Sequence, residues 1–493
     1  MAEFLDVMSE VSLGLDAASS IVPTDYEVLW QAGIARKAHI GSKFQAMGPA
    51  INPRLPPFNA KGIYGETVGL QSTAGSTLLT GGASGTWRQE HVGVDLWVTN
   101  SGASTGIQKT TIASVSEDGS QINMTDPAVT TFTGNKALWL SDDTAAIQAA
   151  LDFVARPNVW EYGGTVILDR FYGVRGVKMR NRTSLVGLSP HTCGLVAYPG
   201  MTGPVLSNAN LYDDFQVVAD IGIHGQKYYQ GTSANIDGYY YFGAGSGLRE
   251  TDVYNRYRNV HVKGAQRDGF FYGGPRGETM AENINTIGSG RNGLSWNGYD
   301  CTISGGHHQA SKNGGYFGSQ CASLRVNNVK FFYSGNALTS LGEGANLYVQ
   351  GQGIVFVNCE SQESASHGVV IAAGHSHRFT DLMIHDTGCV KSGVHGGAAA
   401  LPSRRAALEI AAGVRDCKID ALVTHGLHQS YMTHGIMVQG TTAAGNRPNN
   451  NYGDIRTRSD QPDSIFSVAK VGYAEPEPGA ALNPDLKFDG VAV

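Results

Sequence analysis

The chain has 493 residues, of which 36 are lysine or arginine and 42 are aspartate or glutamate, so its formal net charge at pH 7 is −6. Neither this charge nor any run of basic residues supplies the positive surface that nucleic-acid binding needs, and no stretch of about 18 apolar residues predicts a membrane span. The 65 glycines and the charged fraction of only 16% favour a turn-rich β protein over a helical bundle.

Two regions precede the main body of the chain. Residues 1–60 contain short helical patterns and a loop rich in proline and asparagine, which predict an adaptor segment rather than a domain. Over residues 61–140, short β-branched runs such as Val94–Val98 and Thr110–Val115 alternate with Gly, Ser, Asp and Asn. This second pattern predicts a small antiparallel β domain.

A helix and two strands open the third region, which starts at residue 141. The segment Ser141–Thr144 offers several side chains that cap a helix. Apolar residues then recur at helical spacing at Ile147, Leu151 and Val154. The segments Gly163–Leu168 and Thr183–Leu188 have the apolar, β-branched character of strands. We therefore predict one amphipathic helix followed by strands.

This order, from Asp142 to Gly187, resembles the N-terminal entry of pectate-lyase-like β-helix proteins, which include many phage tailspikes. It departs from that family at Asp169–Gly173, where the family has a Pro-Gly-Thr-Tyr-like turn. The resemblance implies an all-β fold, a right-handed parallel β-helix over residues 141–445. In such a fold the N-terminal helix covers the open end of the coil, and residues 446–493 would form a strand-and-loop tail with a trimer contact.

An internal repeat independently predicts a solenoid. A small polar residue or glycine followed by an apolar residue recurs along the chain at Gly269, Gly293, Gly315, Asn346 and Gly368. The intervals are 24, 22, 31 and 22 residues, which is the length of one coil of a three-sided β-helix with loops in the longer coils. A further loop is predicted between Val394 and Arg405. The six cysteines are far apart, which predicts reduced core residues and no metal site.

Residues at equal offsets from this repeat should stack on one face. Counting eight residues back from Gly269, Gly293, Gly315 and Gly368 gives His261, Asn285, His307 and Glu360, and His385 is predicted to join them in one polar column. Cleavage of a glycosidic bond usually needs two carboxyl groups about 5 to 9.5 Å apart, one protonated and one ionised. Glu360 and Glu363, with Glu343 one coil earlier, are the predicted catalytic acids, and both members of the close pair are expected to project outward.

Histidine and aromatic–guanidinium side chains supply the predicted substrate-binding residues. They are His307, His308, His385, Tyr254 and Arg256. Aromatic rings beside guanidinium groups form a flat surface on which sugars stack. Ordinary roles in packing or at a solvated surface remain open for all of these side chains, and lyase chemistry remains open beside hydrolysis.

The resemblance implies a tailspike that binds, and depolymerises, a bacterial surface polysaccharide such as capsule or lipopolysaccharide. A non-enzymatic receptor-binding spike or fibre is the alternative. We expect a homotrimer located in the virion tail and attached to tail or baseplate proteins through residues 1–60. No cofactor, nucleic acid or membrane partner is predicted. The first residues lack the basic and apolar order of a secretion signal, so we expect synthesis in the host cytoplasm.

Overall fold

The structure is a computed structural model of the 493-residue chain. It describes residues 49–99, 106–155, 163–209, 215–226, 236–242, 254–273, 278–334, 344–365, 367–385, 387, 406–411, 413–425, 434–439, 453–459, 468–471 and 486–489. The helical patterns predicted at the start of residues 1–60 and the loop predicted between Val394 and Arg405 lie outside these ranges. Among the described residues, no helix has the length and hydropathy needed to cross a membrane.

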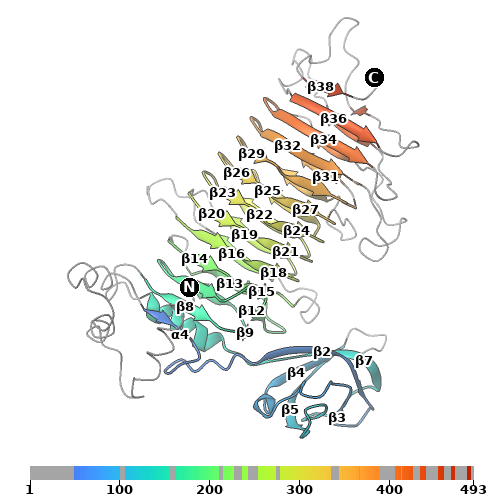
Figure 1. Ribbon diagram of the computed structural model, residues 1–493. Helices are drawn as coiled ribbons and strands as arrows, with labels where there is room; N and C mark the ends of the chain where they lie inside the picture. Colours follow the sequence, from blue (N-terminus) through green and yellow to red (C-terminus); the bar gives the residue numbers. More distant parts are fainter. Residues whose placement is uncertain are drawn as a thin grey trace, which may run out of the picture.

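The small domain is an antiparallel sheet with its own core. Its strand order is β2-β7-β4-β5-β6-β3 (Figure 1). The elements are β2 (Tyr64–Ser72), β3 (Leu78–Leu79), the 3₁₀ helix η1 (Gln89–His91), β4 (Asp95–Thr99), β5 (Ile107–Val115), β6 (Ile122–Met124) and β7 (Phe132–Leu140). Apolar side chains alternate along these strands and bury one face around Trp87, Leu96 and Trp139. A second apolar cluster, with Trp97 against Tyr198, joins the domain to the first coils of the main body.

The main body consists of two parallel sheets that coil around one continuous core (Figure 1). The larger sheet has 21 described strands: β1 (Ala50–Ile51), β8 (Thr165–Leu168), β9 (Phe171–Val174), β11 (Ser184–Gly187), β12 (Gly194–Ala197), β14 (Val217–Ala219), β15 (Gly222–His224), β17 (Arg256–Arg258), β18 (His261–Lys263), β20 (Met280–Glu282), β21 (Asn285–Ile287), β23 (Thr302–Ser304), β24 (His307–Gln309), β26 (Arg325–Asn327), β27 (Lys330–Phe332), β29 (Val355–Val357), β30 (Glu360–Gln362), β32 (Arg378–His385), β34 (Lys418–His425), β36 (Gly453–Ser459) and β38 (Leu486–Asp489). Each strand pairs with the equivalent strand of the next coil, which confirms the predicted fold class.

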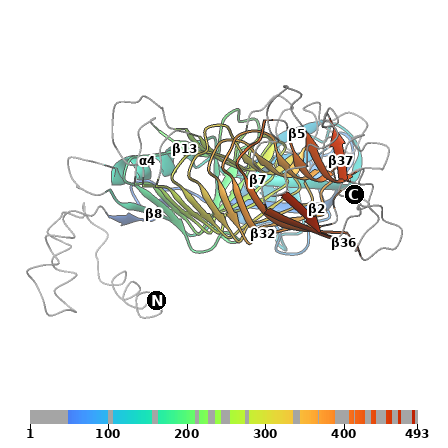
Figure 2. The same cartoon turned by 90° about the horizontal axis from the view of Figure 1, so that it is seen from above.

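The smaller sheet forms the opposite wall of the coil (Figure 2). Its 11 described strands are β10 (Val177–Met179), β13 (Leu206–Asn208), β16 (Tyr239–Phe242), β19 (Phe270–Gly273), β22 (Asn292–Asn297), β25 (Asn313–Phe317), β28 (Ala345–Val349), β31 (His367–Ile371), β33 (Ala406–Ile410), β35 (His434–Gln439) and β37 (Val468–Val471). Strands β36, β37 and β38 continue both sheets past residue 445, so the predicted end of the β-helix was too early. At the other end, β1 pairs with β8, so residues 50–51 of the predicted adaptor segment belong to the first coil.

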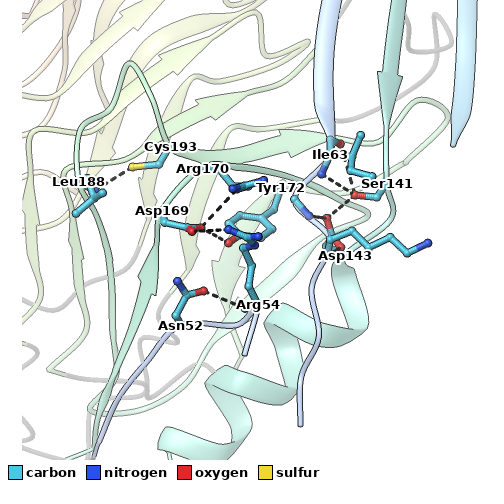
Figure 3. Close-up of polar contacts among 12 residues, drawn as sticks. Asn52, Arg54, Ile63, Ser141, Asp143, Asp169, Arg170, Tyr172, Leu188 and Cys193 are labelled. Carbon is cyan, nitrogen blue, oxygen red and sulfur yellow. Dashed lines mark hydrogen bonds and ion pairs between the residues drawn. The ribbon is translucent and has the colours of Figure 1, made fainter. Parts of the chain in front are cut away.

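The predicted capping helix is α4 (Thr144–Val154), which lies against β1, β8 and β10. Its buried side chains include all three apolar residues predicted to face the core. Asp143, at the N-cap position, makes no side-chain cap bond. Its carboxylate instead accepts hydrogen bonds from Lys61 N at 2.7 Å, Gly62 N at 3.0 Å and Ser141 Oγ at 2.7 Å (Figure 3). Asp143 therefore fastens residues 61–62 to the start of α4.

A second junction in Figure 3 centres on Asp169, the residue after β8. Its carboxylate accepts a hydrogen bond from Tyr172 Oη at 2.5 Å and pairs with Arg54 Nη1 at 3.1 Å. This is the segment that departs from the family turn. The described cysteines, at positions 193, 301, 321, 359 and 417, are buried in the core, as predicted, and Cys389 lies outside the described residues.

One residue with positive φ forms the corner between the two strands that a coil contributes to the larger sheet. Asn259, Asn283, Asn328 and Asn358 fill this corner with φ between 50 and 54°. Asparagine tolerates this left-handed conformation better than most residues. Its side chain also links coils, since Asn283 Nδ2 donates to Asn259 Oδ1 at 3.0 Å. The repeated asparagine therefore fixes which residues of the flanking strands point outward.

Candidate functional site

One outward-facing position of the larger sheet recurs on five successive coils. His261 pairs with Asn285, and the main-chain N–H of His307 donates to Asn285 Oδ1 at 2.9 Å. His307 pairs with Lys330, which in turn pairs with Glu360. We call these five residues the outer polar column. The column predicted from the repeat is thus confirmed for its first three members and Glu360, and Lys330 completes it.

Glu360 is held by two positively charged or protonatable groups. Its Oε1 lies 2.9 Å from Lys330 Nζ and 2.8 Å from His385 Nε2. His385 is not in the outer polar column, because it pairs with Gln362, the next outward position along the strand. Burial raises the pKa of Glu360, but the hydrogen bonds and charges of His385 and Lys330 outweigh burial and lower that pKa below its usual value. Glu360 is therefore ionised at neutral pH.

Glu363 differs from Glu360 in its surroundings. It occupies a corner with φ of 47°, and only 2% of its surface is exposed. Its Oε1 accepts hydrogen bonds from Gln362 Nε2 at 2.7 Å and from Tyr333 Oη at 3.4 Å. The expectation that both carboxylates project outward was wrong, because the corner after β30 turns Glu363 into a buried position.

His308 is a core residue. It follows the exposed His307 on β24, so strand alternation points it inward, where it is fully buried. Its Nδ1 lies 2.9 Å from Thr286 Oγ1 and its ring stacks on Phe331. Burial lowers the pKa of His308 to about 3, so the ring is neutral. The surface ligand-binding role predicted for His308 does not fit this position.

Two other predicted residues, Arg256 and Tyr254, lie away from Glu360. Arg256 is exposed on β17, on the far side of the asparagine corner and four coil steps before the coil of Glu360, or about 19 Å at ~4.8 Å per step. Tyr254, in the same coil as Arg256, stacks on Phe215 with ring centroids 5.3 Å apart. Glu343 lies outside the described residues.

The sequence reasoning missed two residues of this face. Counting eight residues back from Asn346 fails to reach Lys330, because the extra residues of that long coil lie between β27 and β28. Pairing across the coil, at an interval of 23 residues from His307, would have found Lys330. His191, from the turn between β11 and β12, has its ring centroid 4.6 Å from that of His261. It extends the polar surface by one side chain.

The outer polar column places hydrogen-bonding groups along a line. Coils repeat every ~4.8 Å, so its five positions span about 19 Å along the axis. Imidazole, amide, ammonium and carboxylate groups suit the hydroxyl groups of a linear sugar chain. The ionised Glu360 can accept a proton or attack an electrophilic carbon. Among the described residues, no group of three or more His, Cys, Asp and Glu side chains could hold a metal ion.

No protein-family model matches the chain, and no curated protein sequence matches it. Among solved structures, it is similar to the A-module of the mannuronan C-5 epimerase AlgE4 of Azotobacter vinelandii, with 16% identity, a TM-score of 0.45 and coverage of 68% of this chain and 96% of that one. It is also similar to the tailspike protein 2 of the Escherichia coli O157:H7 bacteriophage CAB120, with 15% identity, a TM-score of 0.46 and coverage of 87% of this chain and 53% of that one. For the Dettilon tailspike protein the identity is 10%, the TM-score is 0.45, and the coverage is 86% of this chain and 71% of that one. The chain thus spans about half the length of tailspike protein 2.

Proposed function

We propose that the chain is a tailspike-type protein that binds, and depolymerises, a bacterial surface polysaccharide along the outer polar column. The observation that carries this proposal is the alignment of His261, Asn285, His307, Lys330 and Glu360 on successive coils, which ends at a carboxylate held by Lys330 and His385. The sequence resemblance over residues 142–187 supports the same class of protein. The column offers a glycan strand a repeated set of polar contacts parallel to the axis.

Glu360 is the proposed reactive group. Because its pKa is lowered, it acts as the ionised partner, either as base or as nucleophile, and not as the acid that protonates the leaving oxygen. Lys330 and His385 keep the carboxylate in place by charge-assisted hydrogen bonds. Glu343 remains the proposed acid of a hydrolase, and abstraction of a proton beside a uronate carboxylate is the lyase route open to the same Glu360.

A spike that binds without cleaving is the second candidate. It is favoured by the buried position of Glu363 and by the lowered pKa of Glu360, since the first carboxyl group is not at the surface and the second is ionised. In that case Glu360 serves only as a hydrogen-bond acceptor for sugar hydroxyls.

Assembly into a homotrimer on the virion tail is part of the proposal. Large apolar side chains are exposed at Phe215, just before β14, and at Met280 on β20, on the far side of the asparagine corner from the outer polar column. Exposed apolar side chains are better covered by lateral partners than by water. The part of residues 1–60 that precedes β1 would provide the attachment to tail or baseplate proteins, and the protein would be made in the host cytoplasm.

The test is cleavage of a panel of purified capsular polysaccharides and lipopolysaccharides, followed by size-exclusion chromatography of the products. We expect the wild type to shorten at least one polymer, and Glu360→Gln to reduce the rate by more than about a hundredfold while keeping binding. Glu282→Gln is the matched control, because Glu282 is an exposed carboxylate on β20 of the same sheet. Wild-type binding without shortening would select the non-enzymatic spike. Equal cleavage rates in wild type and Glu360→Gln would remove Glu360 from the mechanism.

A further inference from the structure

Apolar side chains interrupt the polar outer face of the larger sheet at regular intervals. Ile287 on β21 and Met383 on β32 are each 40% exposed, and Phe332 on β27 is partly exposed. Strands β21, β24, β27, β30 and β32 pair in this order, so the three residues lie on every second coil (Figure 1). We call these three residues the apolar series. At ~4.8 Å per coil, its members are about 10 Å apart along the axis.

The apolar series lies beside the outer polar column. Ile287 and Phe332 each occupy the next outward position along the strand, two residues after the member of the column on that strand. Met383 pairs directly with Glu360, so it continues the line of the column by one coil. Phe332 belongs to the coil before Glu360, and Met383 belongs to the coil after it. The carboxylate of Glu360 therefore has an apolar side chain on each side along the axis.

Amide side chains alternate with the apolar series. Gln309 lies between Ile287 and Phe332 at the second outward position, and Gln362 follows Phe332 on the next coil. Both glutamine side chains are partly exposed. An amide group carries donors and an acceptor, and these suit the hydroxyl groups of a sugar. Successive coils thus offer apolar and polar contacts in turn.

The ring of Phe332 is held by two residues of the outer polar column. The ring of His307 meets it edge-on, with centroids 6.0 Å apart and an interplanar angle of 86°, and Lys330 Nζ lies 5.4 Å from its centroid. Lys330 Nζ also lies 2.9 Å from Glu360 Oε1. A side chain that is already fixed loses little conformational freedom when a ligand binds. Lys330 thus links the aromatic ring to the proposed reactive carboxylate.

We propose that the apolar series determines the specificity of this face, and that it selects an extended glycan in which every second sugar turns an unsubstituted C–H face to the protein. The C–H groups of a pyranose ring pack on aromatic and aliphatic side chains. One sugar of an extended chain advances by about one coil step of ~4.8 Å, so alternate sugars meet the apolar series. The sugar at Glu360 is then held between one on Phe332 and one on Met383. This inference rests on the proposed function.

The experiment measures, by isothermal titration calorimetry, the affinity of the full chain for the capsular polysaccharide or lipopolysaccharide of the panel that the wild type binds. Every variant also carries Glu360→Gln, so that the polymer stays intact. Phe332→Ala should weaken binding about tenfold, and Phe332→Tyr, which keeps the ring, should stay within about twofold of the reference protein. Ile287→Ser and Met383→Ser should each weaken binding about threefold.

Fragments of the same polymer, made by partial acid hydrolysis and separated by length, test the spacing. Five coils separate the two ends of the apolar series, counting both end coils, so affinity should rise with length up to about five sugars and then level off. Val129→Ser is the matched control, because it removes a 71% exposed apolar side chain from the small domain and should not change the affinity.

The inference is overturned if Phe332→Ala and Met383→Ser bind the polymer as tightly as the reference protein. It is also overturned if either substitution lowers the oligomeric state, because the apolar series would then be a contact between copies. Polysaccharide binding by the wild type leaves the proposed function standing in both cases. Failure of the wild type to bind any polysaccharide of the panel would overturn the proposed function and this inference together.

Discussion

Asp237 should destabilise the native protein at neutral pH, although it accepts a hydrogen bond. It is 2% exposed, and its Oδ1 accepts from Asp268 N at 2.9 Å. Burial, and then the charge of Asp268, raise the pKa of Asp237 from 3.8 to about 6. A shift of about 2 pKa units corresponds to about 3 kcal/mol between the two protonation states. Relative to the unfolded chain, the folded protein thus favours the neutral form of Asp237.

The sign of the pH dependence follows from the raised pKa. Below pH 3.8 the side chain is neutral in both states and costs nothing, and as pH rises through about 6 the native state progressively loses about 3 kcal/mol. Asp237→Asn keeps the amide oxygen as acceptor and removes the charge. Its native state should therefore be more stable by as much as about 3 kcal/mol at pH 7.5, and by about 1 kcal/mol at pH 4.5.

Unfolding followed by tryptophan fluorescence at pH 4.5 and pH 7.5 measures this difference. The opposite case is Asp152. Burial alone would raise its pKa, but hydrogen bonds from Arg180 and Gln148 outweigh burial and hold the pKa of Asp152 below its usual value. Asp152→Asn should consequently lower the unfolding midpoint at pH 7.5. If Asp237→Asn lowers the midpoint at both pH values, the ionised Asp237 is stabilising and the reasoning fails.

Two further substitutions test the core and a close approach of the backbone. Burial lowers the pKa of His308 to about 3, so below pH 6.5 the unfolded chain takes up a proton that the native state excludes, and the stability of the native state falls. In the His308→Leu variant the thermal midpoint should therefore depend less on pH between 6.5 and 4.5. A pH dependence equal to that of the wild type would contradict this. Gly194 has a φ of 150°, and a Cβ there would lie 1.8 Å from the main-chain oxygen of Gly222, so Gly194→Ala should prevent folding or cost more than about 3 kcal/mol. The control Gly203→Ala, with open space around it, should behave as wild type in the same thermal scan.

The fold could be predicted from the sequence because its signals are local. The capping helix follows from apolar residues at helical spacing, and the coil follows from a repeat whose length matches one turn. The outer polar column could be predicted wherever the coil length is constant, as from His261 to His307. The prediction failed at Lys330. An insertion between β27 and β28 changes the number of residues between the repeat mark and the column, although the strands still pair in register.

The site was harder to predict because orientation depends on single residues. His307 and His308 are neighbours in sequence, yet strand alternation puts one at the surface and the other in the core. Glu360 and Glu363 are three residues apart, yet the positive φ at Glu363 ends the strand and buries the second carboxylate. Corner geometry of this kind is set by tertiary pairing, and a list of acidic residues does not reveal it.

The buried acids of the smaller sheet show the same limit. Asp237 and Asp268 are 31 residues apart and belong to no motif. They meet only because the coil register places the start of β16 beside the start of β19. The acidic pair is therefore not visible without the strand pairing.

The most direct test of the central claim is a structure of the protein with a bound fragment of the polysaccharide that it recognises. The glycan strand should lie along the outer polar column, with sugar hydroxyls in hydrogen-bonding contact with His307, Lys330 and Glu360. A bound glycan that makes no contact with any residue of that column would contradict the account.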